Sequence, residues 1–235
     1  MGRANMKIKK FLTLNNVVVA ITLLVIIISG IYTHQKLLYM IPVCFSLIVM
    51  IVQAEVNRFG YLLGCINLCV YSVVYFLMGL YASALSALFF SLPIQLMILL
   101  NWKRKAYGKA TVFKKMSAKM RIISVLALVL GFFISQYLLT LFGSDYAMLD
   151  TAASLTGVVT NILCMCTYME YAYLGFLHVF LTIALNVQVT LQNPAHVTYL
   201  INSVFAIYCA TVTLINVRKY ILNRVKSRDS FYIKI

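Results

Sequence analysis

Long apolar runs separated by short polar breaks dominate the chain. They fall near residues 11–31, 37–53, 59–78, 80–101, 121–142, 150–168, 171–191 and 196–216. About twenty apolar residues in a helix cross the roughly 30 Å hydrocarbon core of a bilayer. The pattern therefore predicts eight transmembrane helices.

A polar stripe interrupts the seventh run. His178, Thr182 and Asn186 recur four residues apart in "HVFLTIALN", so they share one face of a helix. Polar groups inside a transmembrane segment usually face the interior of the bundle or a water-filled path. We therefore expect this face to be turned away from lipid.

The chain also matches itself at a gap-free offset of 115 residues. The landmarks that this offset pairs are Glu55 with Glu170, Gly60 with Gly175, Asn101 with Asn216, and Pro42 with Gly157. The repeating unit is three helices long, and a linking helix lies between the two copies. Two such units enter the membrane in the same direction, which is the parallel-repeat arrangement of the sugar-transporting SWEET proteins.

These features predict an all-α polytopic membrane protein with eight transmembrane helices. Its segments would be a cytoplasmic N-terminus with a leading helix (1–36), a first three-helix repeat (37–101), a basic cytoplasmic loop with a linker helix (102–149), a second three-helix repeat (150–216) and a basic cytoplasmic tail (217–235). In transporters built this way the substrate binds near the midplane, between the repeats.

The stripe of the seventh run has a partner in the third. Under the offset, Thr182 aligns with Asn67 and Asn186 aligns with Tyr71, while Tyr75 follows one turn later. We predict that the two stripes line one site. Lesser candidates are Gln95 in the fourth run, Asn161 in the sixth and Asn202 in the eighth. Hydrogen bonding between helices is the alternative role for each of these residues.

Composition and charge support a membrane protein and orient it. The chain is 63% hydrophobic and 11% charged, whereas a soluble domain carries roughly 25% charged residues. The net charge of +15 is concentrated in residues 3–10, 103–121 and 218–234. Positive residues near span ends stay cytoplasmic, and eight spans place all three clusters on one face. Both termini are therefore expected in the cytoplasm, and no nucleic-acid partner is expected because topology and anionic lipid account for the clusters.

The predicted site carries no charge. None of the acidic residues, Glu55, Asp145, Asp150, Glu170 and Asp229, is placed deep in the bilayer, and ion coupling usually needs a buried carboxylate. The six cysteines lack a dense metal-ligand cluster, and the chain has no P-loop. A lone His178 without a nearby acid is too little for catalysis. We expect no catalytic residue, metal or cofactor, and a neutral polar or ring-bearing ligand that crosses by facilitated diffusion.

Two stretches resemble the PnuC family of nicotinamide riboside and related vitamin transporters. They are "NRFGYLLGCINLCVYSVVYFLMGLYASALSALFF", with "NW" before the basic linker, and "LDTAASLTGVVTNILCMCTYMEYAYLGF". The resemblance covers roughly residues 37–220. It implies a bundle of three, one and three helices, often trimeric, in a bacterial plasma membrane. Such a bundle carries an unphosphorylated vitamin down its gradient until a cytoplasmic kinase traps it.

One departure from that family bears on the substrate. The family usually shows two tryptophans, three apart, after the glutamate, whereas "YAYLGF" follows Glu170 here. Tyr173 and Phe176 have the same spacing and are candidate aromatic contacts to the ligand. Nicotinamide riboside, a deoxynucleoside and thiamine are all candidate substrates. A substrate-binding membrane subunit of an energy-coupled vitamin importer is the alternative, although such subunits usually lack a repeat of this kind.

Overall fold

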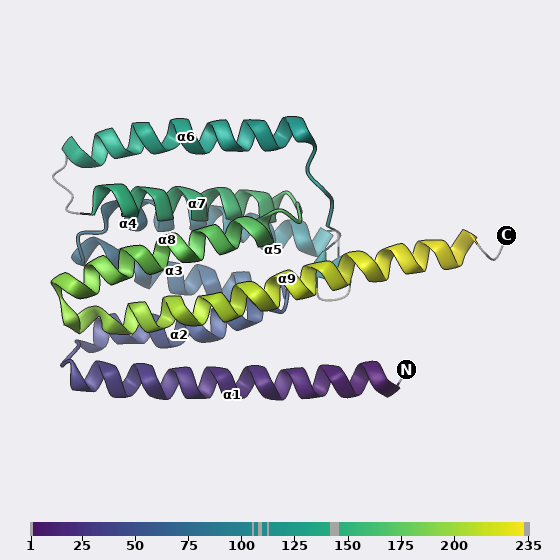
Figure 1. Ribbon diagram of the computed structural model, residues 1–235, viewed down its shortest axis with the longest axis horizontal. Coiled ribbons are helices and arrows are strands. Elements are labelled where there is room, and N and C mark those ends of the chain that lie inside the picture. The colour runs from purple at the N-terminus through teal and green to yellow at the C-terminus, as the bar shows by residue number, and fades with distance from the viewer. Residues whose placement is uncertain (1, 105, 108–109, 112, 142–145, 233–235) are drawn as a thin grey trace.

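The computed structural model describes residues 2–104, 106–107, 110–111, 113–141 and 146–232. Helices dominate it (Figure 1). They are α1 (Gly2–Tyr32), α2 (Leu37–Ala54), α3 (Phe59–Leu77), α4 (Tyr81–Ser86), α5 (Leu92–Arg104), α6 (Ala118–Leu141), α7 (Ala147–Met165), α8 (Tyr171–Gln192) and α9 (Val197–Tyr232). A π-helical turn, η1 (Ala87–Ser91), joins α4 to α5, a 3₁₀ turn, η2 (Pro194–His196), precedes α9, and a short hairpin pairs β1 (Ala106–Tyr107) with β2 (Ala110–Thr111).

The eight predicted spans are confirmed as helices long and apolar enough to cross a membrane. The fourth differs from the expectation of one regular helix, because it consists of α4, η1 and α5 in succession. The sixth, α7, lies three residues earlier than predicted, and α9 continues to Tyr232 through residues predicted as a tail. These shifts have no strong sequence signal. For example, Thr167 follows the end of α7 and has a φ of 60°, a conformation rare for a β-branched residue.

The repeat is real in architecture but not gap-free. Val56 and Thr167, which follow the ends of α2 and α7 with positive φ, are 111 positions apart, whereas the ends of α3 and α8 are 115 apart. The expected pairing of Pro42 with Gly157 is therefore wrong by about one helical turn. The register slips because the loop after α7 is slightly longer than the loop after α2 and because α8, with 22 residues, is longer than α3, with 19.

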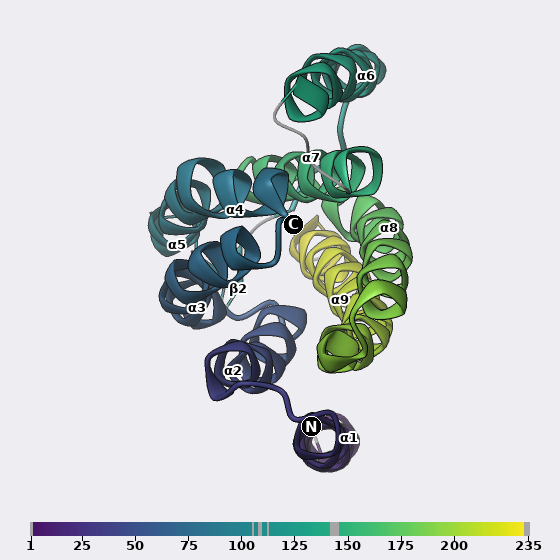
Figure 2. The same cartoon turned by 90° about the vertical axis from the view of Figure 1, so that its left-hand side faces the viewer.

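Figure 2 shows how the repeats are arranged. Helices α2 to α5 form one side of the bundle and α7 to α9 the other, with α1 and α6 outside at opposite edges. The repeats meet where α2 packs on α9 and where α4 and α5 pack on α7. Along the first of these contacts Ser46 donates to Asn202 at 2.8 Å, and Asn216 donates to the Ala54 carbonyl at 3.0 Å.

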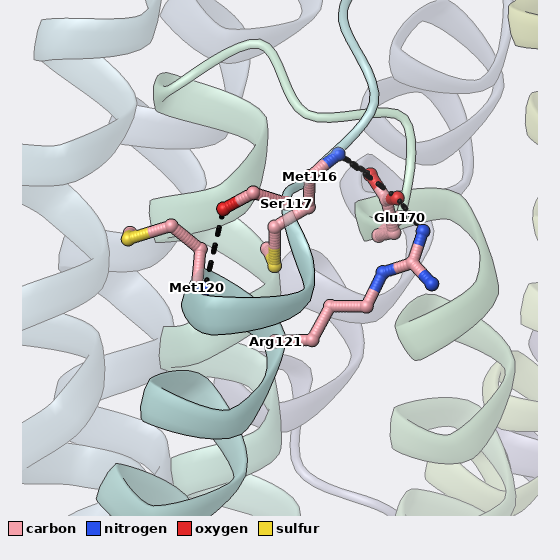
Figure 3. A network of polar contacts seen from close by, with 5 residues as sticks. All are labelled: Met116, Ser117, Met120, Arg121 and Glu170. Atoms are coloured by element: carbon pink, nitrogen blue, oxygen red, sulfur yellow. Dashed lines mark hydrogen bonds and ion pairs between the residues drawn. The ribbon is translucent and has the colours of Figure 1, made fainter.

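The two landmark glutamates fasten the two outer helices. Glu55 accepts a hydrogen bond from Asn15 of α1 at 3.1 Å. Glu170 accepts from the Met116 amide at 3.0 Å and from Arg121 of α6 at 3.0 Å, as Figure 3 shows. Each repeat therefore uses a glutamate at the same end of the bundle to hold a helix that lies outside it.

The three basic clusters lie at one end of the molecule. Both chain termini and the β-hairpin are found there in Figure 1. The described part of the chain gives no side-chain account of residues 2–13, 103–110 or 221–235, so most of the predicted cationic side chains fall outside it, as does Asp145.

Candidate functional site

A cavity of about 390 Å³ lies between the two repeats. Every helix of both repeats contributes to its wall, whereas α1 and α6 contribute none of the described lining residues. Eight of the ten predicted site residues line it, namely Asn67, Tyr71, Tyr75, Gln95, Asn161, His178, Thr182 and Asn186, and so does Asn202. The matching stripes of α3 and α8 thus face one shared space.

Tyr173 and Phe176 do not lie on this wall. Tyr173 is 43% exposed and accepts hydrogen bonds from Arg218 at 3.1 and 3.3 Å. At about 100° per residue, the lining positions of α8 continue backwards from His178 through Gly175 to Tyr171. Tyr171 is buried and is the aromatic residue after Glu170 that reaches the cavity. The tryptophan-like spacing fixes the separation of the two rings and not the helix face that they occupy, and it led to a pair outside the lining of this cavity.

The stripe on α8 lines the cavity and also holds helices together. His178 donates from Nδ1 to the Ala153 carbonyl of α7 at 3.0 Å, and Thr182 donates to the His178 carbonyl at 2.8 Å. Asn186 donates to Ser203 of α9 at 2.5 Å. Two of the three stripe residues, His178 and Asn186, therefore bond to neighbouring helices while all three line the cavity, and in a neutral His178 the acceptor nitrogen is Nε2.

Gly157 explains how the imidazole fits. A Cβ at this position of α7 would stand 2.9 Å from Cε1 of His178, closer than van der Waals contact allows. Glycine generally destabilises the interior of a helix. In the structure Gly157 stays within α7 and makes room for a ring from α8.

Aromatic rings form the α3 side of the wall. Tyr71 and Tyr75 stack with their centroids 5.0 Å apart and an interplanar angle of 29°. The edge of Tyr199 from α9 meets Tyr71 at 6.2 Å. Asn67, one turn before Tyr71, is buried. This wall offers π faces beside an amide.

A pair of glutamines meets at Gly64 of α3. A Cβ at Gly64 would lie 2.1 Å from Oε1 of Gln95 and 2.8 Å from Nε2 of Gln53. Gln53 donates to the Gly60 carbonyl at 3.2 Å. Oε1 of Gln95 is buried and has no hydrogen-bond partner among the described residues. Such an atom is costly unless something donates to it.

Asp150 is buried beside the cavity but is not one of its lining residues. It is 0% exposed and accepts from the amides of Ala82 at 2.8 Å and Ser83 at 3.1 Å, and from the Ser83 hydroxyl at 2.5 Å. The carboxylate of α7 therefore caps the start of α4 in the other repeat. The sequence placed this residue near the outer face and gave no sign of its complete burial.

Other lining residues were not predicted. Besides Gln53 and Tyr171, the polar ones are Ser46, Tyr61, Ser83, Ser86, Ser91, Ser154, Thr160, Ser203 and Thr213. Serine and threonine commonly donate to their own helix backbone, so their presence in an apolar run is a weak signal. Only their spacing relative to the recognised stripes could have identified them.

The described lining residues include no Asp, Glu, Lys or Arg. Within the same described part of the chain, no three His, Cys, Asp or Glu side chains form a cluster that could hold a metal, and all six cysteines are free. The polar groups of the wall are amides, hydroxyls, phenols and one imidazole, and they lie among apolar side chains such as Met50, Leu68 and Leu80. The wall is suited to hydrogen bonding and stacking with a neutral polar molecule.

Two three-helix repeats around a polar cavity, in a bundle of eight membrane-length helices, define a multi-pass transporter of small solutes. The family model described as nicotinamide mononucleotide transporter matches residues 36–216, and the chain belongs to this family. It is accordingly a transporter and not an enzyme.

The solved structure of the vitamin B3 transporter PnuC has the same fold. The two chains superpose with a TM-score of 0.66 at 20% identity, over 86% of this chain and 92% of that one. The search of curated proteins found no match. The resemblance to the PnuC family seen in the sequence is confirmed.

Proposed function

We propose that this transporter takes up nicotinamide riboside, or a related unphosphorylated ring compound, by facilitated diffusion. The observation that carries the proposal is the cavity between the repeats, whose described lining combines apolar side chains with polar groups that carry no charge. Its volume of about 390 Å³ falls within the roughly 300–1,000 Å³ of small-molecule sites.

The absence of charge from the described lining favours a riboside over its phosphate. A phosphate group is usually held by arginine, lysine or the amides of a helix N-terminus. Bringing a dianion into this wall without such partners would be unfavourable. Phosphorylation inside the cell would then trap the product, because the phosphorylated form would not fit the pathway that admitted its precursor.

The aromatic wall supports a ring-bearing substrate. The stacked pair Tyr71 and Tyr75, and Tyr171 elsewhere in the lining, offer aromatic surface to a flat ring. A pyridinium ring carries delocalised positive charge, which such faces attract. Gln95 and His178 provide polar atoms for the substituents of the ring or sugar. Thiamine also carries a cationic ring and a deoxynucleoside also stacks, so both belong in the test.

The cellular setting of the proposal is a bacterial plasma membrane, with both termini in the cytoplasm. Resemblance to the PnuC family supports this setting and a homotrimeric assembly. A substrate-binding subunit of an energy-coupled importer would bind the same ligands, but would transport them only with its energising partners. Uptake by the purified protein alone in liposomes distinguishes the two.

Thermal stabilisation against a panel of ligands tests the proposal. The panel contains nicotinamide riboside, nicotinamide mononucleotide, thiamine, riboflavin, nucleosides and deoxynucleosides. A bound ligand at 100 times its dissociation constant adds about 2.7 kcal/mol of stability. We expect one unphosphorylated ring compound to stabilise the protein and its phosphate not to do so.

Two glutamines provide a matched pair of variants. The side-chain oxygens of Gln95 and Gln136 are both buried without a hydrogen-bond partner among the described residues, but only Gln95 lines the cavity. Because each change removes an unpaired polar atom, Gln95→Leu and Gln136→Leu should both keep the stability of the free protein. We expect Gln95→Leu alone to weaken ligand binding, by about tenfold or more for a lost hydrogen bond of roughly 1.4 kcal/mol.

Asn186→Ala is a poorer probe of the site. Its amide donates to Ser203, so its loss would disturb the contact of α8 with α9 as well as the cavity. If no ring compound stabilises the wild-type protein, or if only phosphorylated ones do, the proposal is wrong.

A further inference from the structure

Part of the connection between α5 and α6 is hydrogen-bonded to the second repeat. Residues 113–116, which we call the linker segment, run along the loop between α7 and α8. The Lys114 amide donates to the Thr167 carbonyl at 2.9 Å, and the Met169 amide donates to the Lys114 carbonyl at 3.0 Å. The linker segment is therefore paired through its backbone to the second repeat.

Glu170 fastens the other end of this segment. Its carboxylate oxygens accept from the Met116 amide at 3.0 and 3.1 Å, and one of them also pairs with Arg121 at 3.0 Å (Figure 3). Bonds of this kind to a charged acceptor are roughly twice as strong as neutral ones. One side chain thus holds both the linker segment and the first turns of α6 against the start of α8.

A layer of aromatic side chains lies between the linker segment and the cavity. Trp102 of α5 is 0% exposed, and its ring meets Tyr61 at 5.1 Å and Phe113 at 5.7 Å. Phe113 in turn stacks on Tyr171 at 5.8 Å. Nε1 of Trp102 donates to the Cys164 carbonyl of α7 at 3.3 Å.

The inner members of this layer belong to the cavity wall. Tyr61, Cys164 and Tyr171 line the cavity, whereas Trp102 and Phe113 are not among the lining residues and lie behind them. The layer is found where α3 and α8 begin and where α5 and α7 end. In Figure 1 this is the end that carries both termini.

The contact between the two repeats, which we call the seam, also passes through this layer. Tyr61 and Trp102 belong to the first repeat and Tyr171 belongs to the second, whereas the linker segment lies outside both repeats and is bonded through its backbone to the second. A solute held between parallel repeats leaves at one end only when the repeats part there. Parting at this end would separate Trp102 from Phe113.

We propose that the linker segment is the gate at this end of the pathway, that it closes the cavity by seating Phe113 against Trp102, and that Glu170 is the positioning residue that keeps it on the second repeat. The inference rests on the transport function proposed above. It assigns a gating role to a connection that belongs to neither repeat.

The protein contains its own reporter of this gate. Trp102 is the single tryptophan of the chain, so tryptophan fluorescence reports on the seam alone. A buried ring is quenched poorly by acrylamide in water, and its quenching rises when the ring becomes accessible in an open population. The measurement uses the full-length protein in lipid nanodiscs and needs no substrate.

Glu170→Gln is the test variant and Glu55→Gln its matched control. Both remove one carboxylate charge at the same end of the bundle, but Glu55 holds α1 through Asn15. Arg121→Gln is a second variant, which weakens the fastening while Glu170 still accepts from Met116. We expect Glu170→Gln to raise the acrylamide quenching constant of Trp102 by about twofold or more, Arg121→Gln to raise it less, and Glu55→Gln to leave it at the wild-type value.

The inference is overturned if Glu170→Gln and Arg121→Gln both leave the quenching of Trp102 unchanged, or if Glu55→Gln raises it equally. Should Glu170→Gln fail to fold, the comparison of Arg121→Gln with Glu55→Gln decides. If the gate proposal fails this test, a ligand can still stabilise the wild-type protein. If the proposed transport function is wrong, no ligand of the panel stabilises the protein, whatever the quenching result.

Discussion

The absence of a Cβ atom at two glycines leaves room for side chains that reach the cavity. Gly64 of α3 leaves room for the two glutamines, and Gly157 of α7 leaves room for the imidazole of His178. Close approach of this kind is common at helix contacts in membranes, where small residues let neighbours pack tightly. The two glycines therefore shape the candidate site as much as the side chains that line it.

Gly64→Ala tests this point, with Gly175→Ala as the control. Both glycines line the cavity, but a Cβ at Gly175 meets nothing within 4 Å. We expect Gly64→Ala to push Gln95 aside, to destabilise the protein by about 1–3 kcal/mol through overpacking and to weaken ligand binding. Gly175→Ala should be neutral, or more stable by up to about 1 kcal/mol because alanine favours helix. Melting temperatures with and without ligand check both; equal behaviour of the two variants would contradict the close contact at Gly64.

Among whole elements, the broken helix formed by α4, η1 and α5 stands out. A π-helical turn inside a helix is often found at a functional position, and here Ser86, Ala87 and Ser91 at the turn line the cavity. The short α4 before it has only six residues. Its start is held by Asp150 from the other repeat. The element that passes the site is therefore anchored across the interface between the repeats.

Asp150→Ala should destabilise this anchor. The change leaves the part-buried amides of Ala82 and Ser83 without their acceptor, at a cost of up to roughly 1–3 kcal/mol for each donor. Ser154→Ala is the milder control, since Ser154 reaches Asp150 only at 3.4 Å. Thermal unfolding of the two variants in the same detergent gives the comparison. If Asp150→Ala melts with the wild type, the carboxylate does not hold α4.

The whole molecule has two interfaces between its repeats and two helices outside them. Two polar bonds lie along the interface of α2 with α9. Ser46 donates one near the middle of α2, and Asn216 donates the other near the bundle end. Helices α1 and α6 are each fastened at that same end by a glutamate of one repeat. The contacts that fasten the two outer helices, and those that we assign to the gate, therefore lie at the end that carries the termini (Figure 1).

Orientation is a prediction at this scale. Positive clusters stay on the cytoplasmic side, and both termini share one end with the basic linker. Protease-sensitive tags at either terminus should be protected in right-side-out vesicles and cut in inverted ones. A tag beside Asn193, in the turn between α8 and α9, should show the reverse. A terminal tag cut in right-side-out vesicles would contradict the assignment of both ends to the cytoplasm.

Much of the site followed from pattern alone. The stripes that contain Asn67 and Asn186 were identified because polar residues at helical spacing in an apolar run need a polar neighbour. Tyr173, selected from the spacing of a family motif, is not among the residues that line the cavity, because such a spacing does not state which helix face a residue occupies. Gln53 and Tyr171 were missed because each is a single polar or aromatic residue near the end of a run, where the membrane interface is the ordinary explanation.

The sequence by itself determined the number of spans, the two parallel repeats and the transporter family, because these depend on hydropathy and periodicity that each segment carries independently of its neighbours. Only the tertiary structure decided the register of the repeat loops, the burial of Asp150, the faces of α8 that meet the cavity and the seating of Phe113 on Trp102. These depend on distances between residues far apart in the chain. Such distances are set by packing, in which a one-turn shift or a single Cβ changes the contact.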